Sequence, residues 1–219
     1  MNRGKLIVFE GADGSGKTTQ SKLLVNYLKD KKIPSAYISF PRYKDSLWGK
    51  MVRRFLNGEF GKIDEVDPYL ASLAYAGDRM TAKDQMKKWL DSGKVVVCNR
   101  YIGSNIGHMA AKFSKQIDRQ EYIEWLENLE YEENGIPRED LVIFLHVPVE
   151  ISRKLMKDRK LDIHEANLEY LGKVVDVYEM MAKTRNNWVR VRCTDNGRLL
   201  SAEKIQERVL EVLRKRKVI

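Results

Sequence analysis

The fold of this chain follows from one loop sequence near its N-terminus, Gly11-Ala12-Asp13-Gly14-Ser15-Gly16-Lys17-Thr18-Thr19. The loop matches the pattern G-x-x-x-x-G-K-[ST], with a short apolar run before it (6–9) and a helical pattern after it (23–28). Glycines let such a loop curl so that its N–H groups point at phosphate oxygens, and the helix adds the positive end of its dipole. The sequence therefore predicts a phosphate loop that binds a nucleoside triphosphate.

Two residues of this loop have expected roles of their own. Lys17 is expected to reach the β- and γ-phosphates, and the Thr18 hydroxyl is expected to bind Mg²⁺. Glycines at positions 11, 14 and 16 do not fit the dinucleotide pattern G-x-G-x-x-G. All nine residues are predicted to bind the triphosphate: Gly11, Ala12, Asp13, Gly14, Ser15, Gly16, Lys17, Thr18 and Thr19.

Five short apolar runs predict the strands of one sheet: 6–9, 36–40, 95–98, 141–147 and 188–193. The first, third and fourth are nearly continuous, which is typical of strands buried on both faces, whereas the last alternates and indicates a sheet edge. Helical patterns lie between the runs, at 23–28, 122–129, 168–181 and 205–213, and Asp67-Pro68 predicts the start of a helix that runs to about Leu90. Strands that alternate with helices predict a parallel sheet with helices on both faces, in a single domain of residues 1–219.

The composition is that of a soluble globular protein, with 219 residues, of which 43% are hydrophobic and 32% charged. No apolar run approaches the roughly 18 residues of a membrane span, and the N-terminal run is too short for a secretory signal. Two cysteines, Cys98 and Cys193, are too few for a disulfide scaffold. We therefore expect a cytoplasmic protein with no membrane partner. The net charge of +9 suits either a nucleic acid or a polyanionic substrate, so the charge alone does not decide the ligand.

A phosphate loop by itself leaves GTPases, ATPase motors and small-molecule kinases open. The base-specifying N-K-x-D motif of GTPases does not occur in this sequence. Motors need a strand that ends in a metal-binding carboxylate, and the runs 95–98 and 141–147 end in Asn99-Arg100 and His146-Val147-Pro148 instead. A small-molecule kinase is therefore favoured.

Four further stretches follow in order along the chain: Phe40-Pro41-Arg42, Tyr75-Ala76-Gly77-Asp78-Arg79, Asn99-Arg100-Tyr101 with Ser104, and a basic segment after Val147. Together with 9–20 they resemble the thymidylate kinase family over most of the chain. The resemblance implies a three-layer P-loop kinase fold with a five-stranded parallel sheet and a short lid at about 152–165. It also implies a homodimer that phosphorylates dTMP to dTDP with Mg²⁺ and ATP, in dTTP synthesis for DNA replication.

The resemblance implies which residues hold the acceptor nucleotide. Asp13 is placed beside the sugar, and Arg42 and Arg100 on the phosphate, where a planar guanidinium can bind two oxygens. Tyr75 is placed where its ring stacks on thymine, and Arg79 where it donates to the base carbonyl O4. The expected substrate-binding set is Asp13, Phe40, Arg42, Tyr75, Arg79, Arg100, Ser104 and Asn105.

The lid is the expected source of catalytic charge. Family members without an arginine in the phosphate loop supply basic residues from the lid, and Gly14 stands at that loop position here. The first candidate to stabilise the transferring phosphoryl group is Arg159, followed by Lys160, Lys157 and Arg153. The expected catalytic set is Lys17, Asp13 and Arg159.

Two residues depart from the family pattern. Asn99 stands where better-known members have Asp, so metal binding is expected to rest on Thr18, with Glu10 and Asp13 as helpers. Met109 stands where a polar residue often reads the base, which leaves strict selectivity for thymine open. We expect His108 and His164 to be packing or surface residues.

Two other functions remain open from the sequence. One is a kinase for another acceptor, such as dUMP, dCMP or a deoxynucleoside. The other is a nucleic-acid-binding or regulatory P-loop protein without turnover, which rests on the net charge of +9. The basic residues are scattered, so we expect nucleotides as ligands and no specific nucleic-acid partner.

Overall fold

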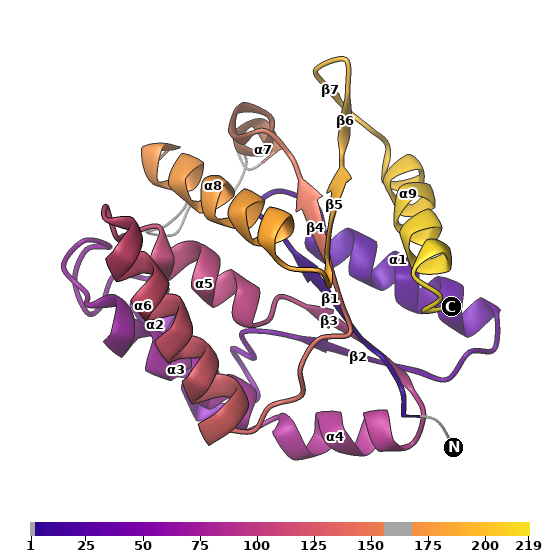
Figure 1. Cartoon of the computed structure of the whole chain (residues 1–219), viewed down its shortest axis with the longest axis horizontal. Coiled ribbons are helices and arrows are strands. Elements are labelled where there is room, and N and C mark those ends of the chain that lie inside the picture. The colour runs from indigo at the N-terminus through magenta and orange to yellow at the C-terminus, as the bar shows by residue number, and fades with distance from the viewer. Residues whose placement is uncertain (1–2, 156–167) are drawn as a thin grey trace.

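A computed structural model, which describes residues 3–155 and 168–219, has a five-stranded parallel sheet at its centre (Figure 1). The strand order is β2-β3-β1-β4-β5, and every neighbouring pair runs parallel. The strands are β1 (Leu6–Glu10), β2 (Ser35–Ser39), β3 (Val95–Asn99), β4 (Leu141–His146) and β5 (Trp188–Arg192). All five apolar runs therefore form strands, and the predicted α/β fold class is confirmed.

The central strand β1 is buried on both faces, as its nearly continuous apolar sequence predicts. It pairs with β3 on one side and with β4 on the other. Because successive side chains of a strand point to opposite faces, Leu6 and Val8 enter one hydrophobic cluster, and Ile7 and Phe9 enter the other. The alternating strand β5 lies at an edge of the sheet, also as predicted.

Helices cover both faces of the sheet (Figure 1). On one face lie α1 (Lys17–Asp30) and α9 (Ala202–Lys215). The other face carries α3 (Pro68–Met80), α4 (Lys83–Asp91), α5 (Ile102–Ala110), α6 (Gln116–Glu127) and α8 (Leu168–Thr184), and α2 (Leu47–Leu56) packs against α3. The remaining elements are a π-helix, η1 (Asn128–Glu133), the helix α7 (Val149–Leu155) and a hairpin of β6 (Thr194–Asp195) and β7 (Arg198–Leu199). Within the described parts of the chain, no helix is both long enough and apolar enough to cross a bilayer.

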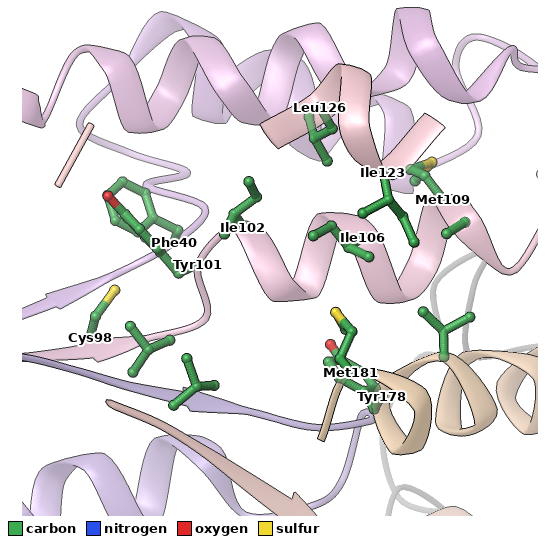
Figure 2. Close-up of a cluster of buried hydrophobic side chains, with 14 of the residues drawn as sticks. Phe40, Cys98, Tyr101, Ile102, Ile106, Met109, Ile123, Leu126, Tyr178 and Met181 are labelled. Carbon is green, nitrogen blue, oxygen red and sulfur yellow. The ribbon is translucent and has the colours of Figure 1, made fainter. Parts of the chain in front are cut away.

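The helix α5 lies inside the larger of the two clusters. Figure 2 shows Ile106 of α5 between Ile123 of α6 and the side chains Tyr178 and Met181 of α8. A Cβ atom on Gly107 would lie 2.8 Å from the ring of Tyr178, so only glycine lets α8 approach this closely. Nearly every residue of α5 is buried, and its polar residues face a cavity and not solvent, so the helix lacks the usual alternation of apolar and exposed polar faces and the periodicity did not predict it.

The helix expected from Asp67 to about Leu90 is two helices, α3 and α4. Asp67 does cap α3, because its carboxylate accepts from the first N–H groups of the helix. The break comes at Thr81, whose hydroxyl donates to the carbonyl oxygen of Asp78 at 2.9 Å. The N–H of Ala82 turns back to the carbonyl of Arg79 instead, and α4 begins at Lys83 in a new direction.

One substitution in α1 tests how much the packing of this helix against the sheet contributes to the free energy of unfolding. Leu24 is fully buried, so Leu24→Ala should lower the free energy of unfolding by about 2–5 kcal/mol through the lost burial and the cavity left behind. Leu23→Ala, at the neighbouring half-buried position, is the matched control and should lower it far less. Urea denaturation measures both, and equal losses would contradict the assignment of Leu24 to this core.

Candidate active site

Three strands end in polar residues at the same edge of the sheet. β1 ends at Glu10, β2 at Ser39 and β3 at Asn99. Ligands of parallel α/β sheets bind at this carboxyl edge, and two cavities open there. Asp13 and Arg100 line both cavities, so the two cavities meet at these side chains.

The phosphate-loop cavity is lined by residues 13–20, Arg100, Leu155, Leu199, Leu200, Ala202 and Ile205. Gly16 has a φ of 87°, a left-handed conformation that glycine adopts readily, and α1 starts at the next residue. The unpaired N–H groups of the first turn of α1 are therefore available to an anion in this cavity. The predicted ATP-binding residues from Asp13 to Thr19 line it, whereas Gly11 and Ala12 do not.

Gly11 and Ala12 instead hold the loop lysine. The buried ammonium group of Lys17 donates to the carbonyl oxygens of both residues, each at 2.8 Å. A Cβ atom on Gly11 would lie 2.6 Å from the carbonyl oxygen of Leu145, which explains why the loop needs glycine there. The positive charge thus lies at the base of the loop, and the contact of Lys17 with the β- and γ-phosphates stays a prediction.

One wall of the phosphate-loop cavity comes from the far end of the chain, and the sequence analysis did not predict it. Leu199, Leu200, Ala202 and Ile205 form it, and Gln20 of α1 donates to the carbonyl oxygen of Ala202 at 2.9 Å. No motif marks these residues, because their role depends only on α9 lying beside α1.

The second cavity, here called the α5 cavity, is lined by Asp13, Phe40, Pro41, Tyr43, Leu56, Tyr75, Asp78, Arg79, Arg100, Tyr101, Ser104, Asn105, His108 and Met109. Every residue of the predicted acceptor set lines it except Arg42. Asn105 is buried, and neither atom of its amide has a hydrogen-bond partner within the described residues. An amide in this state can both donate to and accept from a ligand.

Arg42 does not line the α5 cavity in this structure. Its Nε donates to the carboxylate of Asp78 at 3.1 Å, and its Nη2 donates to the backbone carbonyl of Asp78 and to the Thr81 hydroxyl. The backbone N–H of Arg42 also donates to the Asp78 carboxylate at 2.7 Å. The predicted contact of Arg42 with the acceptor phosphate stays a prediction.

The junction of the two cavities is a cluster of charges around Asp13. Arg100 donates to the Asp13 carboxylate, and the ammonium nitrogen of Lys17 lies 3.9 Å from the same oxygen. Arg100 has a left-handed φ of 65°, and at this residue the chain turns from the end of β3 toward the start of α5. Burial acts to lower the pKa of Arg100, but Asp13 together with other nearby acidic groups, Glu10 among them, outweighs burial and raises the pKa, so the guanidinium stays positive. Two cations facing one carboxylate favour anions at this point.

His108 belongs to this cluster, although it was expected to be a packing or surface residue. Its Nε2 lies 3.8 Å from a carboxylate oxygen of Asp13. Burial lowers the pKa of His108 to about 4, and the charges of Arg100 and Lys17 act in the same direction, against that of Asp13. The imidazole is therefore neutral at physiological pH. Its position four residues after Ser104 on one helix was the only signal for it in the sequence.

Glu10 caps the helix α5. One carboxylate oxygen accepts from the N–H groups of Tyr101 and Ser104 at 2.8 and 2.9 Å, and the other accepts from the Ser104 hydroxyl at 2.5 Å. Burial raises its pKa, and the bonds from Ser104 and Tyr101 partly offset this. Glu10 lines neither cavity, and the expectation that it helps to hold Mg²⁺ stays a prediction. It is the cap of α5, which has no side-chain cap of its own at Tyr101.

Thr18 and Asn99 form a donor set that fits Mg²⁺. The amide nitrogen of Asn99 donates to the Thr18 hydroxyl at 3.2 Å and to the Ser39 hydroxyl at 3.0 Å. The amide oxygen of Asn99 is buried and has no hydrogen-bond partner in the described residues. Mg²⁺ takes oxygen ligands and keeps several waters, so a hydroxyl and an amide oxygen beside bound phosphates suit it.

The predicted lid residues lie mostly outside the described residues. Arg159, Lys160, Lys157 and His164 fall in the range 156–167, which the structure does not describe. Arg153 is an exposed residue of α7. Arg159 therefore stays a prediction.

The sequence model of thymidylate kinase matches residues 9–208. The chain belongs to this family. Probable thymidylate kinases of Methanocaldococcus jannaschii and Pyrococcus horikoshii are 35% and 33% identical to it, over 82% and 86% of this chain and 82% and 83% of those proteins. The thymidylate kinase of Plasmodium falciparum is 29% identical over 88% of this chain and 83% of that protein.

A thymidylate kinase of Candida albicans has a similar structure, with a TM-score of 0.78 and coverage of 99% of this chain and 93% of that one. Its sequence identity of 22% makes this a likeness of fold. Membership of the family confirms the expected enzyme class and reaction, a kinase that phosphorylates dTMP with ATP as the phosphate donor.

The neutral state of His108 gives stability a pH dependence of definite sign. Its pKa is about 4 in the folded protein against an ordinary 6.5, so the unfolded chain binds more protons in this window and stability falls as the pH falls through it. When the pH is lowered from 7 to 5, the free energy of unfolding should fall in both proteins. The fall should be about 1–2 kcal/mol smaller in the variant His108→Gln than in the unsubstituted enzyme. Urea denaturation at each pH measures this, and parallel stability curves would show that His108 is not held neutral.

Proposed function

We propose that this enzyme binds ATP in the phosphate-loop cavity and dTMP in the α5 cavity, and transfers the γ-phosphoryl group where the cavities meet. The observation that carries the proposal is that Asp13 and Arg100 line both cavities. An oxygen of the dTMP phosphate attacks the γ-phosphorus as the bond to the β-phosphate oxygen breaks, giving dTDP and ADP. The product feeds dTTP synthesis for DNA replication.

The donor phosphates lie against the N–H groups of the loop and the first turn of α1. Lys17 exchanges its present partners, the carbonyl oxygens of Gly11 and Ala12, for phosphate oxygens that carry full negative charge. The Thr18 hydroxyl and the amide oxygen of Asn99 are the groups that would hold Mg²⁺. When bound, the ion offsets the charge on the β- and γ-phosphates.

The acceptor is held by its base, its sugar and its phosphate. Tyr75 packs against the base, Arg79 donates to its carbonyl O4 and Asn105 bonds its edge. Arg100 holds the phosphate beside the phosphate loop, and Asp13 faces the sugar. No general base is needed, because the acceptor is already an anion. The work of the site is to align two anions and to offset their repulsion.

We assign the remaining charge to Arg159, within a lid of residues 152–165 in a single kinase domain of residues 1–219. Gly14 contributes no charge from the loop, so we assign the further cation for the transferring group to the basic residues of the lid. We also place the enzyme in the cytoplasm, which suits its two free and buried thiols, Cys98 and Cys193.

An ADP-release assay with ATP and a panel of acceptors tests the proposal: dTMP, dUMP, dCMP, dGMP, UMP and thymidine. We expect the highest kcat/KM with dTMP, because a mismatched base would leave buried donors unpaired. We expect no turnover with thymidine, which has no phosphate for Arg100 to hold. A different best acceptor would overturn the base contacts, and no turnover with any of them would overturn kinase activity.

Lys17→Ala tests the catalytic loop separately from the fold. Removing the ammonium group should lower kcat by at least about a hundredfold while the melting temperature stays close to that of the unsubstituted enzyme. Lys22→Ala is the matched control, an exposed lysine of the same helix. If both variants keep their activity, Lys17 has no part in the mechanism.

We propose further that the enzyme is a homodimer and that α2 and α3 form its interface. These two helices pack on each other and carry large apolar side chains that are exposed in the single chain: Leu47, Trp48 and Met51 on α2, and Leu70 and Leu73 on α3. Exposed apolar groups gathered in this way mark contact surfaces.

Charge placed on these helices should split the dimer. We expect the double variant Leu47→Glu/Leu70→Glu to shift the mass measured by light scattering from dimer to monomer. The control Lys29→Glu, on α1 at the opposite face of the sheet, should leave the mass unchanged. A monomer before any substitution would contradict the homodimer, and a dimer that survives the double variant would place the interface elsewhere.

A further inference from the structure

A buried ion pair lies directly behind the α5 cavity. The exposed fraction is 2% for Arg79 and 0% for Glu130. Nε of Arg79 donates to Oε1 of Glu130 at 2.7 Å, and Nη2 donates to the same oxygen. Arg79 lines the cavity and Glu130 does not, so Glu130 can act on a ligand only through Arg79.

The fold delivers Glu130 to this position through a π-helix. α6 continues into η1, where the N–H of Asn134 donates to the carbonyl of Leu129 at 2.9 Å, five residues back. π-Helical turns are rare and often occur at functional sites. The next residue, Tyr131, is fixed in turn by its hydroxyl, which donates to Glu139 at 2.6 Å. The Glu130 carboxylate therefore comes from a segment that is fixed by the π-helical hydrogen bond and by the neighbouring Tyr131.

The contacts of Arg79 leave part of its guanidinium available to a ligand. Besides the two bonds to Glu130, its Nη1 donates to the carbonyl oxygen of Tyr101 at 3.3 Å. Three of the five N–H donors of an arginine are thus used, which leaves two, one on each terminal nitrogen. With the plane of the group fixed at three points, the two remaining donors have fixed directions.

We propose that Glu130 is a positioning residue for base selection, which fixes the guanidinium of Arg79 so that it accepts a base with a carbonyl at position 4 and rejects one with an amino group there. This rests on the proposed function, in which Arg79 donates to O4 of thymine. A guanidinium has donors only, so it bonds a carbonyl oxygen but leaves the amino group of cytosine facing a second donor. Without Glu130 the side chain could turn away from that clash.

The charge balance supports the same role. Burial acts to lower the pKa of Arg79, but the charge of Glu130 and the hydrogen bonds to it outweigh this and raise the pKa. The guanidinium therefore stays charged although the side chain is buried. A buried ion pair of this kind adds little net stability compared with apolar side chains, so its value here lies in orientation.

The test is base selectivity in Glu130→Asp and Glu130→Gln, measured as kcat/KM with dTMP, dUMP and dCMP. Glu130→Asp withdraws the carboxylate by one methylene, and Glu130→Gln removes its charge. We expect the dTMP:dCMP ratio to fall about tenfold or more in both, because a misplaced contact group costs this much. The dTMP:dUMP ratio should not change, since both bases carry O4. A loss of stability alone would affect all acceptors alike, so it would not lower one ratio and leave the other unchanged.

Glu132→Gln is the matched control. It lies in the same π-helix, and its ion pair with Arg138 is exposed on both sides. Both ratios should equal those of the unsubstituted enzyme. If Glu130→Asp folds and keeps the dTMP:dCMP ratio, Glu130 does not position Arg79 and the inference is wrong.

Arg79→Met and the double variant Arg79→Met/Glu130→Leu complete the test. The double variant buries no charge, so it remains measurable even where Glu130→Gln unfolds. If Glu130 acts only through Arg79, the double variant has the same dTMP:dCMP ratio as Arg79→Met, and a further change would overturn the inference. If Arg79→Met itself keeps the original ratio, the base contact in the proposed function fails, which is a separate result.

Discussion

The active site depends on a single buried carboxylate, Glu10, which joins the centre of the sheet to the helix α5. The phosphate loop leaves β1 directly after this residue, and the N–H groups at the start of α5 bond to it. Donor and acceptor cavities are therefore built on opposite sides of one fixed point. Gly103 leaves room for this contact, because a Cβ atom there would lie 3.0 Å from the Glu10 carboxylate and 2.8 Å from the ring of Trp188. In the proposed function, the fold therefore sets the relative position of the two nucleotides before either one binds.

Charge is distributed around that fixed point so that each buried cation faces a carboxylate. Arg100 and Lys17 face Asp13, and Arg79 faces Glu130. Pairing keeps these groups charged where water is scarce, and it also fixes their directions. In the proposed function, phosphates that enter the junction of the cavities meet buried cations that exchange protein partners for phosphate oxygens, and these cations stabilise the transferring phosphoryl group.

The sequence predicts the parts of this enzyme that are local. The phosphate loop is one contiguous motif, and the doubly buried strands need only their own apolar runs. Parts that depend on distant neighbours were missed: α5 has no solvent-exposed face, and the wall around Leu200 depends on α9 packing beside α1. The prediction of one long helix from Asp67 was wrong for a related reason. The helix breaks at Thr81, whose hydroxyl bonds the carbonyl of Asp78, and Arg42 from another segment bonds the same carbonyl. Arg79 was found through the family motif, but its partner Glu130 carries no motif at all.

The left-handed backbone of Arg100 has a consequence for how this chain can change. Side chains other than glycine are disfavoured in that conformation by about 1–2 kcal/mol per residue, yet this position carries the arginine that both cavities share. Selection for stability alone would replace it with glycine, and selection for turnover keeps the guanidinium in place. Libraries of variants screened only for thermal stability will therefore accumulate glycine at position 100 and yield well-folded but inactive enzymes. A search for more stable variants has to keep Arg100 unchanged.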